Sequence, residues 1–161
     1  MHLGIVLRPI APLQSCRRFS CTSERLLFIV GPSQRSFMAV IPSLVSVVDD
    51  DESVRESLPD LLQEFGFAVR AFSSAEAFLS SDCLDQTHCL IVDVAMPGMS
   101  GPELHRELVG RQQQIPTVFI TAHRDDAVRS HLLARGAVAC LFKPYSESAL
   151  LEALNAALAA S

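Results

Sequence analysis

The chain has 161 residues, of which 49% are hydrophobic, and its formal net charge at pH 7 is −5. This length fits one domain with a sizeable core. No stretch approaches the ~18 consecutive apolar residues of a membrane span, and the negative charge excludes a general nucleic-acid-binding surface. The five cysteines are odd in number and lack the spacing of a disulfide framework, so we expect a reducing, cytoplasmic setting.

Residues 1–37 differ in charge from the rest of the chain. They hold five arginines and one glutamate, a net charge of +4, whereas the remainder holds eight basic and seventeen acidic residues, a net charge of −9. Proline and glycine interrupt the segment, and Met38 offers a second plausible start. We expect an N-terminal extension, either disordered or derived from an upstream translation start. One domain then follows over residues 38–161.

Strand and helix patterns alternate from residue 44 onward. An apolar run at 44–48 predicts a strand, and apolar residues at helical spacing predict a helix over about 53–65. A short strand is predicted at 68–72. Ser73 and Glu76 have the spacing of a capping box, which predicts the start of a second helix.

The most informative stretch is CLIVDVAMPGMSG, residues 89–101. Its continuous apolar run predicts a strand buried on both faces, as is typical of parallel sheets. The run ends on a single carboxylate, Asp93. Because such sheets bind ligands at the carboxyl ends of their strands, we expect Asp93 to lie at a functional edge.

The remaining chain repeats this alternation. Its predicted elements are a helix opened by the capping-box pair Ser100 and Glu103, a strand at 117–122, a helix at about 125–135, a strand at 139–142 and a helix at about 146–159. Val128 and Leu132 are expected to face the core. Five strands alternating with five helices predict an α/β fold, a doubly wound five-stranded parallel sheet with helices on both faces.

Polar residues follow four of the five predicted strands. They are Asp49 with Asp50, then Asp93, Thr121 and Lys143. All must emerge at the same edge of a parallel sheet, where three carboxylates repel one another unless a cation binds. Mg²⁺ accepts carboxylates, a carbonyl and waters as ligands. Together with a lysine and a hydroxyl, such a site suits phosphoryl transfer with Asp93 as the nucleophile.

Several segments resemble the receiver domains of two-component response regulators. VVDDDESVRESL, LIVDVAMPGMSG, VFITAHRDD and CLFKP are similar to segments of the FixJ-like branch, and the resemblance covers Leu44 to about Ala159. It implies a flavodoxin-like, CheY-like sheet of order 2-1-3-4-5. It also implies a phosphorelay protein, in which Asp93 accepts a phosphoryl group from a sensor histidine kinase. The chain would not be an enzyme, beyond self-dephosphorylation at most.

The resemblance implies a Mg²⁺ site. Asp50 would bind the ion directly, and Asp49 would act through water. Asp93 and the backbone carbonyl of Ala95 would complete the metal shell.

Thr121 and Lys143 would contact the phosphoryl group, and the resemblance implies a cis peptide bond between Lys143 and Pro144. Two features depart from the family pattern. Cys140 stands where many receivers carry tyrosine or phenylalanine, so the usual aromatic switch is missing. We also expect no helix-turn-helix output domain after the last helix. We therefore expect a stand-alone receiver that does not bind DNA or membranes, acts on a downstream protein, and could dimerise on phosphorylation.

Two other hypotheses stay open from the residues. A phosphorylation-independent docking module would keep the receiver fold, and Cys140 favours it. A haloacid-dehalogenase-like phosphatase would use Asp49, Asp51 and Thr121, but it leaves Asp93 unexplained. Turnover of a phosphomonoester would distinguish the phosphatase from a receiver.

Overall fold

The computed structural model describes residues 42–160. The predicted extension at 1–37 lies outside the described residues. Within the described part of the chain, no helix combines the length and apolar character that crossing a membrane requires.

The described residues form five strands and five helices in strict alternation, with one short 3₁₀ turn that the sequence patterns did not predict. The elements are β1 (Leu44–Val48), α1 (Glu52–Glu64), β2 (Ala68–Phe72), α2 (Ala75–Leu79), η1 (Leu84–Gln86), β3 (Cys89–Asp93), α3 (Gly101–Gly110), β4 (Thr117–Thr121), α4 (Asp126–Ala134), β5 (Ala139–Phe142) and α5 (Glu147–Ala159). The predicted strands at 44–48, 68–72 and 139–142 have the observed bounds.

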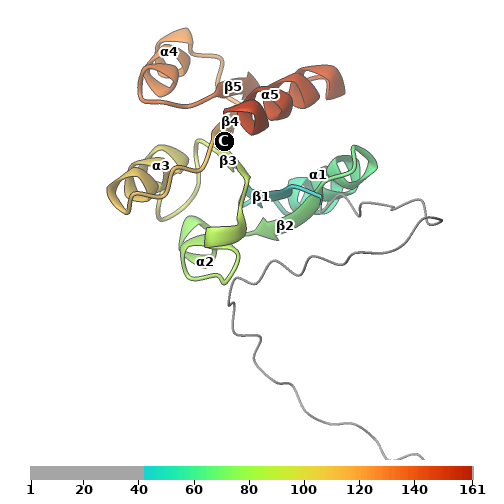
Figure 1. Ribbon diagram of the computed structural model, residues 1–161. Coiled ribbons are helices and arrows are strands. Elements are labelled where there is room, and N and C mark those ends of the chain that lie inside the picture. Colours follow the sequence, from blue (N-terminus) through green and yellow to red (C-terminus); the bar gives the residue numbers. More distant parts are fainter. Residues whose placement is uncertain (1–41, 161) are drawn as a thin grey trace, which may run out of the picture. The chain divides into compact units, whose positions relative to one another are not determined.

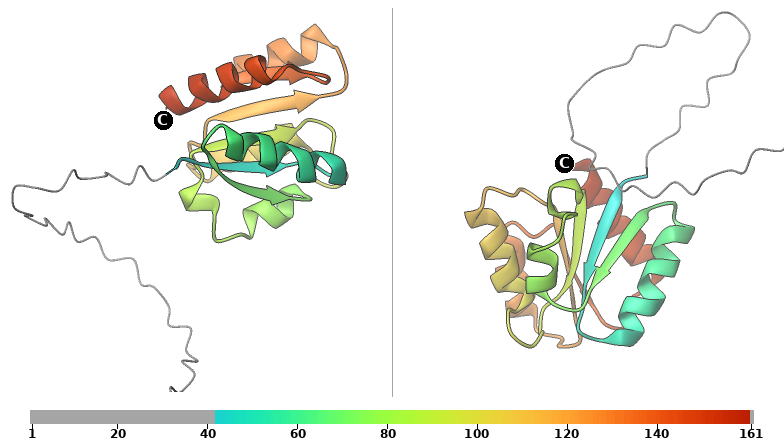
Figure 2. Two further views of the ribbon diagram at one scale, coloured as in Figure 1. Left: turned by 90° about the vertical axis from the view of Figure 1, so that its right-hand side faces the viewer. Right: turned by 90° about the horizontal axis from the view of Figure 1, so that it is seen from below.

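All strand pairs are parallel, and the sheet order is β2-β1-β3-β4-β5, as predicted. Helices α1 and α5 cover one face of the sheet, and α2, α3 and α4 cover the other (Figure 1). The strand arrowheads in the right-hand view of Figure 2 point to one common edge. This doubly wound arrangement brings the residues that follow each strand to the same edge.

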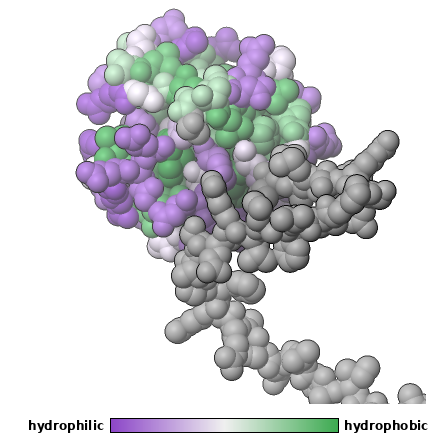
Figure 3. All heavy atoms as spheres, in the orientation of Figure 1, coloured by the Kyte–Doolittle hydropathy of each residue, from purple (hydrophilic) through white to green (hydrophobic). Residues whose placement is uncertain are grey.

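Strand β3 lies at the centre of the core. All five of its residues are buried. Successive side chains of a strand point to opposite faces. Accordingly, Leu90 and Val92 belong to the apolar cluster under α2, α3 and α4, whereas Cys89 and Ile91 belong to the cluster under α1 and α5. Hydrophilic residues are frequent on the α3 side of the face seen in Figure 3, and apolar residues gather toward its α5 side.

Helix α4 is less buried than its sequence pattern predicts. Leu132 is its one buried residue, but Val128 is 38% exposed, so the prediction that Val128 faces the core was wrong. The helix has only nine residues and packs mainly on the edge strand β5. Such a short helix at a sheet edge buries one turn, and the turn around Val128 lies outside that contact.

The helix caps largely follow the sequence signals. Asp51 caps α1 by accepting the backbone N–H of Ser53, and Ser100 and Glu103 form the predicted capping box of α3. The prediction for α2 was wrong by one residue, because Ser74 and not Ser73 is the N-cap. Glu76 therefore lies too early in the helix for a capping box, and its carboxylate is free to bond elsewhere.

We predict that Gly101→Ala destabilises the fold by about 3 kcal/mol, at the upper end of overpacking costs. A Cβ atom at Gly101 would collide with the backbone carbonyl of Asp93, and backbone cannot move aside as a flexible side chain can. Gly110→Ala is the matched control at the other end of α3, because a Cβ atom there would meet no atom within 4 Å apart from its chain neighbours and the nearby backbone of its own helix. There we expect a gain of up to about 1 kcal/mol. Urea unfolding of both variants measures the difference, and equal stabilities would contradict this packing.

Candidate functional site

The carboxyl ends of β1, β3 and β5 meet at a buried ion-pair cluster. The Nζ atom of Lys143, just after β5, lies 2.7 Å from Oδ1 of Asp93 and 2.9 Å from Oδ2 of Asp49. Asp49 is 2% exposed and Asp93 is 7% exposed. Residues that are 94 and 50 positions away from the lysine in the chain thus converge on one ammonium group.

The second oxygen of each buried carboxylate is held by backbone. Oδ2 of Asp93 accepts the N–H of Ala95 at 2.7 Å, and Oδ1 of Asp49 accepts the N–H of Asp51 at 2.9 Å. Buried carboxylates are tolerated when they are paired and hydrogen-bonded in this way. Both side chains therefore have fixed orientations, and the loop that carries the Ala95 carbonyl is tied to Asp93.

The carboxylates determine the ionisation of their neighbours. Burial alone would lower the pKa of Lys143, but the hydrogen bonds and charges of Asp93 and Asp49 outweigh it, so the pKa is raised. For Tyr145 the effect of burial is the opposite: it raises the pKa of the phenol, the nearby carboxylates add to that shift, and Lys143 opposes it. The lysine is therefore cationic and the phenol neutral at physiological pH. The Lys143–Pro144 peptide bond is cis, as the resemblance implied.

Asp50 differs from the other two acids. Its side chain is exposed and makes no hydrogen bond or ion pair with any residue in 42–160. Over the same range, no three His, Cys, Asp or Glu side chains form a ready-made metal cluster. The positive charge that the predicted carboxylates require is supplied in this structure by Lys143. A free carboxylate at Asp50, beside Asp93 at the same edge, still fits Mg²⁺, which needs only one or two carboxylates and fills its shell with a carbonyl and waters.

Thr121 lies at the predicted edge, at the end of β4, and is 3% exposed. Its hydroxyl accepts the backbone N–H of His123 at 3.2 Å, and its backbone carbonyl accepts the N–H of Lys143 at 2.8 Å. The hydroxyl is thus engaged locally rather than with Asp93. The structure places all the predicted site residues at one edge and bonds Lys143 to two of them.

Comparison with known proteins identifies the family of this chain. The family model described as the response regulator receiver domain matches residues 45–155. The chain belongs to the response regulator receiver domain family. Receiver domains are generally not enzymes, so the phosphatase hypothesis has no support from the family.

Among curated proteins, the receiver is 40% identical over 116 residues to the response regulator protein TodT of Pseudomonas putida, a match that covers 72% of this chain and 51% of TodT. It is 40% identical over 113 residues to the transcriptional regulatory protein FixJ of Rhizobium meliloti, covering 70% and 55% of the two chains. The chain thus spans about half the length of the curated relatives it matches.

Solved structures agree with the fold. A crystal structure of FixJ-N is 38% identical with a TM-score of 0.66, covering 73% of this chain and 94% of that one. The response regulator StyR is 44% identical with a TM-score of 0.69, covering 74% and 60%. The chemotaxis protein CheY4 of Vibrio cholerae is 27% identical with a TM-score of 0.65, covering 71% and 97%, so the predicted CheY-like fold is confirmed.

Cys140 is packed inside this receiver. It is 3% exposed and joins the cluster that contains Phe119 and Leu132. Burial raises the pKa of its thiol, so the side chain acts as a small apolar residue. Two residues after Cys140 on β5, the centroid of the Phe142 ring lies 5.8 Å from the guanidinium carbon of Arg129. No aromatic side chain at position 140 is available to move between a buried and an exposed position.

Three residues around the site were missed by the sequence reasoning. Arg55 donates to the backbone carbonyls of Asp49 and Asp50. Glu76 accepts the backbone N–H of Met99 at 3.1 Å. The charges of Lys143, Asp49 and Asp93 affect the pKa of the third residue, Tyr145. The available signal for Arg55 was its position one turn into α1, near the helix N-terminus, where a cation is disfavoured. No pattern in the sequence pointed to the Glu76 contact, which joins α2 to the loop after β3.

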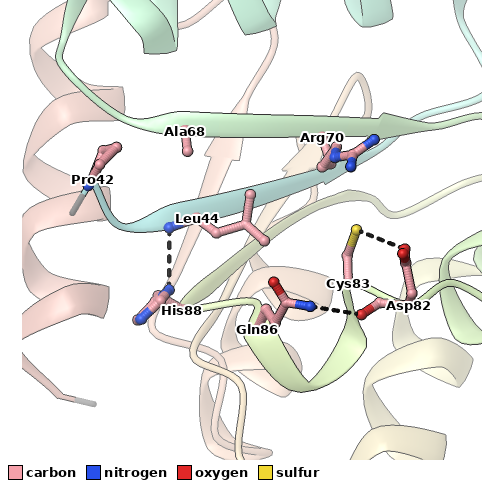
Figure 4. Close-up of a pocket in the computed structure, with 8 residues that line it drawn as sticks. All are labelled: Pro42, Leu44, Ala68, Arg70, Asp82, Cys83, Gln86 and His88. Carbon is pink, nitrogen blue, oxygen red and sulfur yellow. Dashed lines mark hydrogen bonds between the residues drawn. The ribbon is translucent and has the colours of Figure 1, made fainter. Parts of the chain in front are cut away.

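A separate cavity of about 460 Å³ lies at the opposite end of the strands (Figure 4). It is lined by Pro42, Leu44, Ala68, Arg70, Asp82, Cys83, Gln86 and His88. Leu44 and Ala68 are the first residues of β1 and β2, so the cavity lies at their amino ends. Its polar groups are largely paired within the chain, as with Nδ1 of His88, which accepts the backbone N–H of Leu44. No predicted site residue lines this cavity.

We predict that Lys143→Met lowers the free energy of unfolding at pH 8 by about 2 kcal/mol, less than the cost of breaking a fully buried pair because the lysine side chain is 25% exposed. A pKa that is raised in the folded state contributes stability below the unfolded value, near 10.5, and loses it as the pH rises through the folded value. Wild-type and variant stabilities should therefore converge above pH 10.5. Urea unfolding from pH 8 to 11.5 tests this, and a constant difference would contradict it.

Proposed function

We propose that this receiver accepts a phosphoryl group on Asp93 from a sensor histidine kinase and thereby switches its interaction with a downstream protein. The observation that supports the proposal is the convergence of Lys143 on Asp93 and Asp49 at the carboxyl edge of the sheet. A lysine in that position can neutralise charge on a phosphoryl group as well as on the carboxylates.

The proposed step forms one bond and breaks one. A carboxylate oxygen of Asp93 attacks the phosphorus of a phosphohistidine, the P–N bond breaks as the P–O bond forms, and the imidazole nitrogen takes up a proton. Asp93 is already oriented by Lys143 and by the N–H of Ala95. This orientation is the contribution that positioning makes to phosphoryl transfer. The Thr121 hydroxyl would turn from His123 toward the phosphoryl oxygens.

Asp50 and Asp93, with the carbonyl of Ala95, would hold Mg²⁺, and Asp49 would act through water. The bound ion would offset the charge that accumulates on the transferring phosphoryl oxygens. Asp50 is suited to direct binding because no protein group occupies its carboxylate in the described part of the chain.

The downstream role is inferred from the relatives. One of them is named a transcriptional regulatory protein and another a response regulator protein. We infer a cytoplasmic signalling protein whose phosphorylated form binds its partner differently, with a dimer as one form of the response. The 38–161 unit would carry this function.

We predict that intact-protein mass spectrometry after incubation with acetyl phosphate and Mg²⁺ shows one added phosphoryl group. Asp93→Asn should remove it because the nucleophilic oxygen is lost, and chelation of Mg²⁺ should remove it in the wild type. Asp60→Asn is the matched control, since this exposed acid on α1 lies outside the site. An adduct that persists in Asp93→Asn would contradict the assignment.

A docking module that signals without phosphorylation is the second candidate, and the buried Cys140 favours it because the usual aromatic switch is missing. Sedimentation velocity with and without beryllofluoride, which mimics the phosphoryl group, tests this alternative. A change in oligomeric state that Asp93→Asn abolishes would exclude it. Unchanged oligomeric state and unchanged partner affinity would support it over the phosphorylation switch.

A further inference from the structure

Arg55 reaches back from α1 to the loop that carries the acidic residues. Its Nη1 atom donates to the carbonyl oxygen of Asp49 at 3.0 Å and to that of Asp50 at 2.7 Å. The side chain is half-buried, and the Arg55 backbone N–H donates to the carbonyl of Asp51. One arginine thus contacts the loop at three consecutive residues.

The position of Arg55 has an electrostatic cost. The N-terminus of a helix carries partial positive charge, which disfavours a cation in its first turns. Charge-assisted hydrogen bonds to two carbonyl oxygens offset that cost, since they are stronger than neutral ones. The arginine is therefore held in place by the loop rather than by a carboxylate partner.

These two bonds fix the backbone on both sides of Asp50. The carbonyl of Asp49 belongs to the peptide unit before the Asp50 Cα, and the carbonyl of Asp50 belongs to the unit after it. Two peptide planes held by one nitrogen leave little freedom in the φ and ψ of Asp50, and these angles determine the direction of its Cα–Cβ bond.

The other two acids of the site do not depend on this restraint. Asp49 and Asp93 each have both carboxylate oxygens bonded to the protein. The Asp50 carboxylate has no such contact within residues 42–160, so only its backbone places it.

We propose that Arg55 is a positioning residue that orients Asp50 for Mg²⁺ by holding the carbonyls of Asp49 and Asp50. This inference rests on the proposed function, because it concerns the metal of the same site. Groups that orient metal ligands without touching the metal typically change metal affinity by about 10- to 100-fold when they are removed.

Charge and positioning predict opposite effects, which makes the proposal testable. Arg55 is a cation close to a cation site, so as a charge alone it would repel Mg²⁺. Arg55→Met would then strengthen Mg²⁺ binding, and Arg55→Lys, which keeps the charge, would leave it unchanged. A positioning role predicts that both variants bind Mg²⁺ more weakly, because neither side chain reproduces the guanidinium geometry.

The test is a titration of the full chain with MgCl₂, followed by the backbone amide NMR signals of the β1–α1 and β3–α3 loops. We expect Arg55→Met to weaken Mg²⁺ binding about tenfold, the lower end of the range for such orienting groups. Arg55→Lys should weaken it less. Arg70→Met is the matched control, because it removes the same charge from an exposed position on β2 and should change the dissociation constant by less than twofold. An unchanged or tighter constant in Arg55→Met would overturn the proposal.

Two combinations of results distinguish a failure of the Arg55 proposal from a failure of the proposed function. If the wild type forms the acetyl phosphate adduct and Arg55→Met binds Mg²⁺ normally, only the role of Arg55 is overturned. If the wild type neither binds Mg²⁺ nor forms the adduct, both proposals are overturned. Far-UV circular dichroism without Mg²⁺ checks folding, and if Arg55→Met is unfolded, weaker Mg²⁺ binding by Arg55→Lys supports the proposal and unchanged binding overturns it.

Discussion

The contact of Lys143 with Asp93 and Asp49 is the constraint on which the site depends. Two carboxylates that are almost completely buried would repel each other and lose hydration without a cation between them. The lysine removes that conflict and fixes the carboxylates, but it also ties the loop after β5 to the loops after β1 and β3. A phosphoryl group on Asp93 would add charge at the point where these loops meet. The added charge would therefore affect the packing of the α4–β5–α5 region as well as the site.

The parallel arrangement of the strands brings Lys143, Asp93 and Asp49 together. Strand β3 is buried along its whole length and pairs with β1 and β4, so the residues after the strands share one edge. These features could be predicted from the sequence, because the run that ends at Asp93 is continuously apolar and four of the five predicted strands lead into a polar residue. The capping box of α3 followed from an equally local signal, the spacing of Ser100 and Glu103, whereas the sheet order followed from the family resemblance.

Other features could not be predicted, for reasons specific to each. The cap at Ser74 rather than Ser73 depends on where β2 ends, because either serine can serve as an N-cap although only Ser73 has the capping-box spacing to Glu76. The exposure of Val128 depends on how far the short α4 extends beyond its contact with the sheet. The hydrogen bonds of Glu76 and Arg55 join side chains to backbone groups, which no residue pattern encodes. Direct binding of Asp50 to Mg²⁺ and the role of Thr121 remain proposals.

The central assignment is Asp93 as the residue that carries the phosphoryl group. Borohydride reduces an acyl phosphate to an alcohol, so a phosphorylated aspartate becomes homoserine and can be located by peptide sequencing. After incubation with acetyl phosphate and Mg²⁺, we expect homoserine at position 93 and at no other acidic residue. Homoserine at Asp49 or Asp50, or none in a protein shown to be phosphorylated, would contradict it.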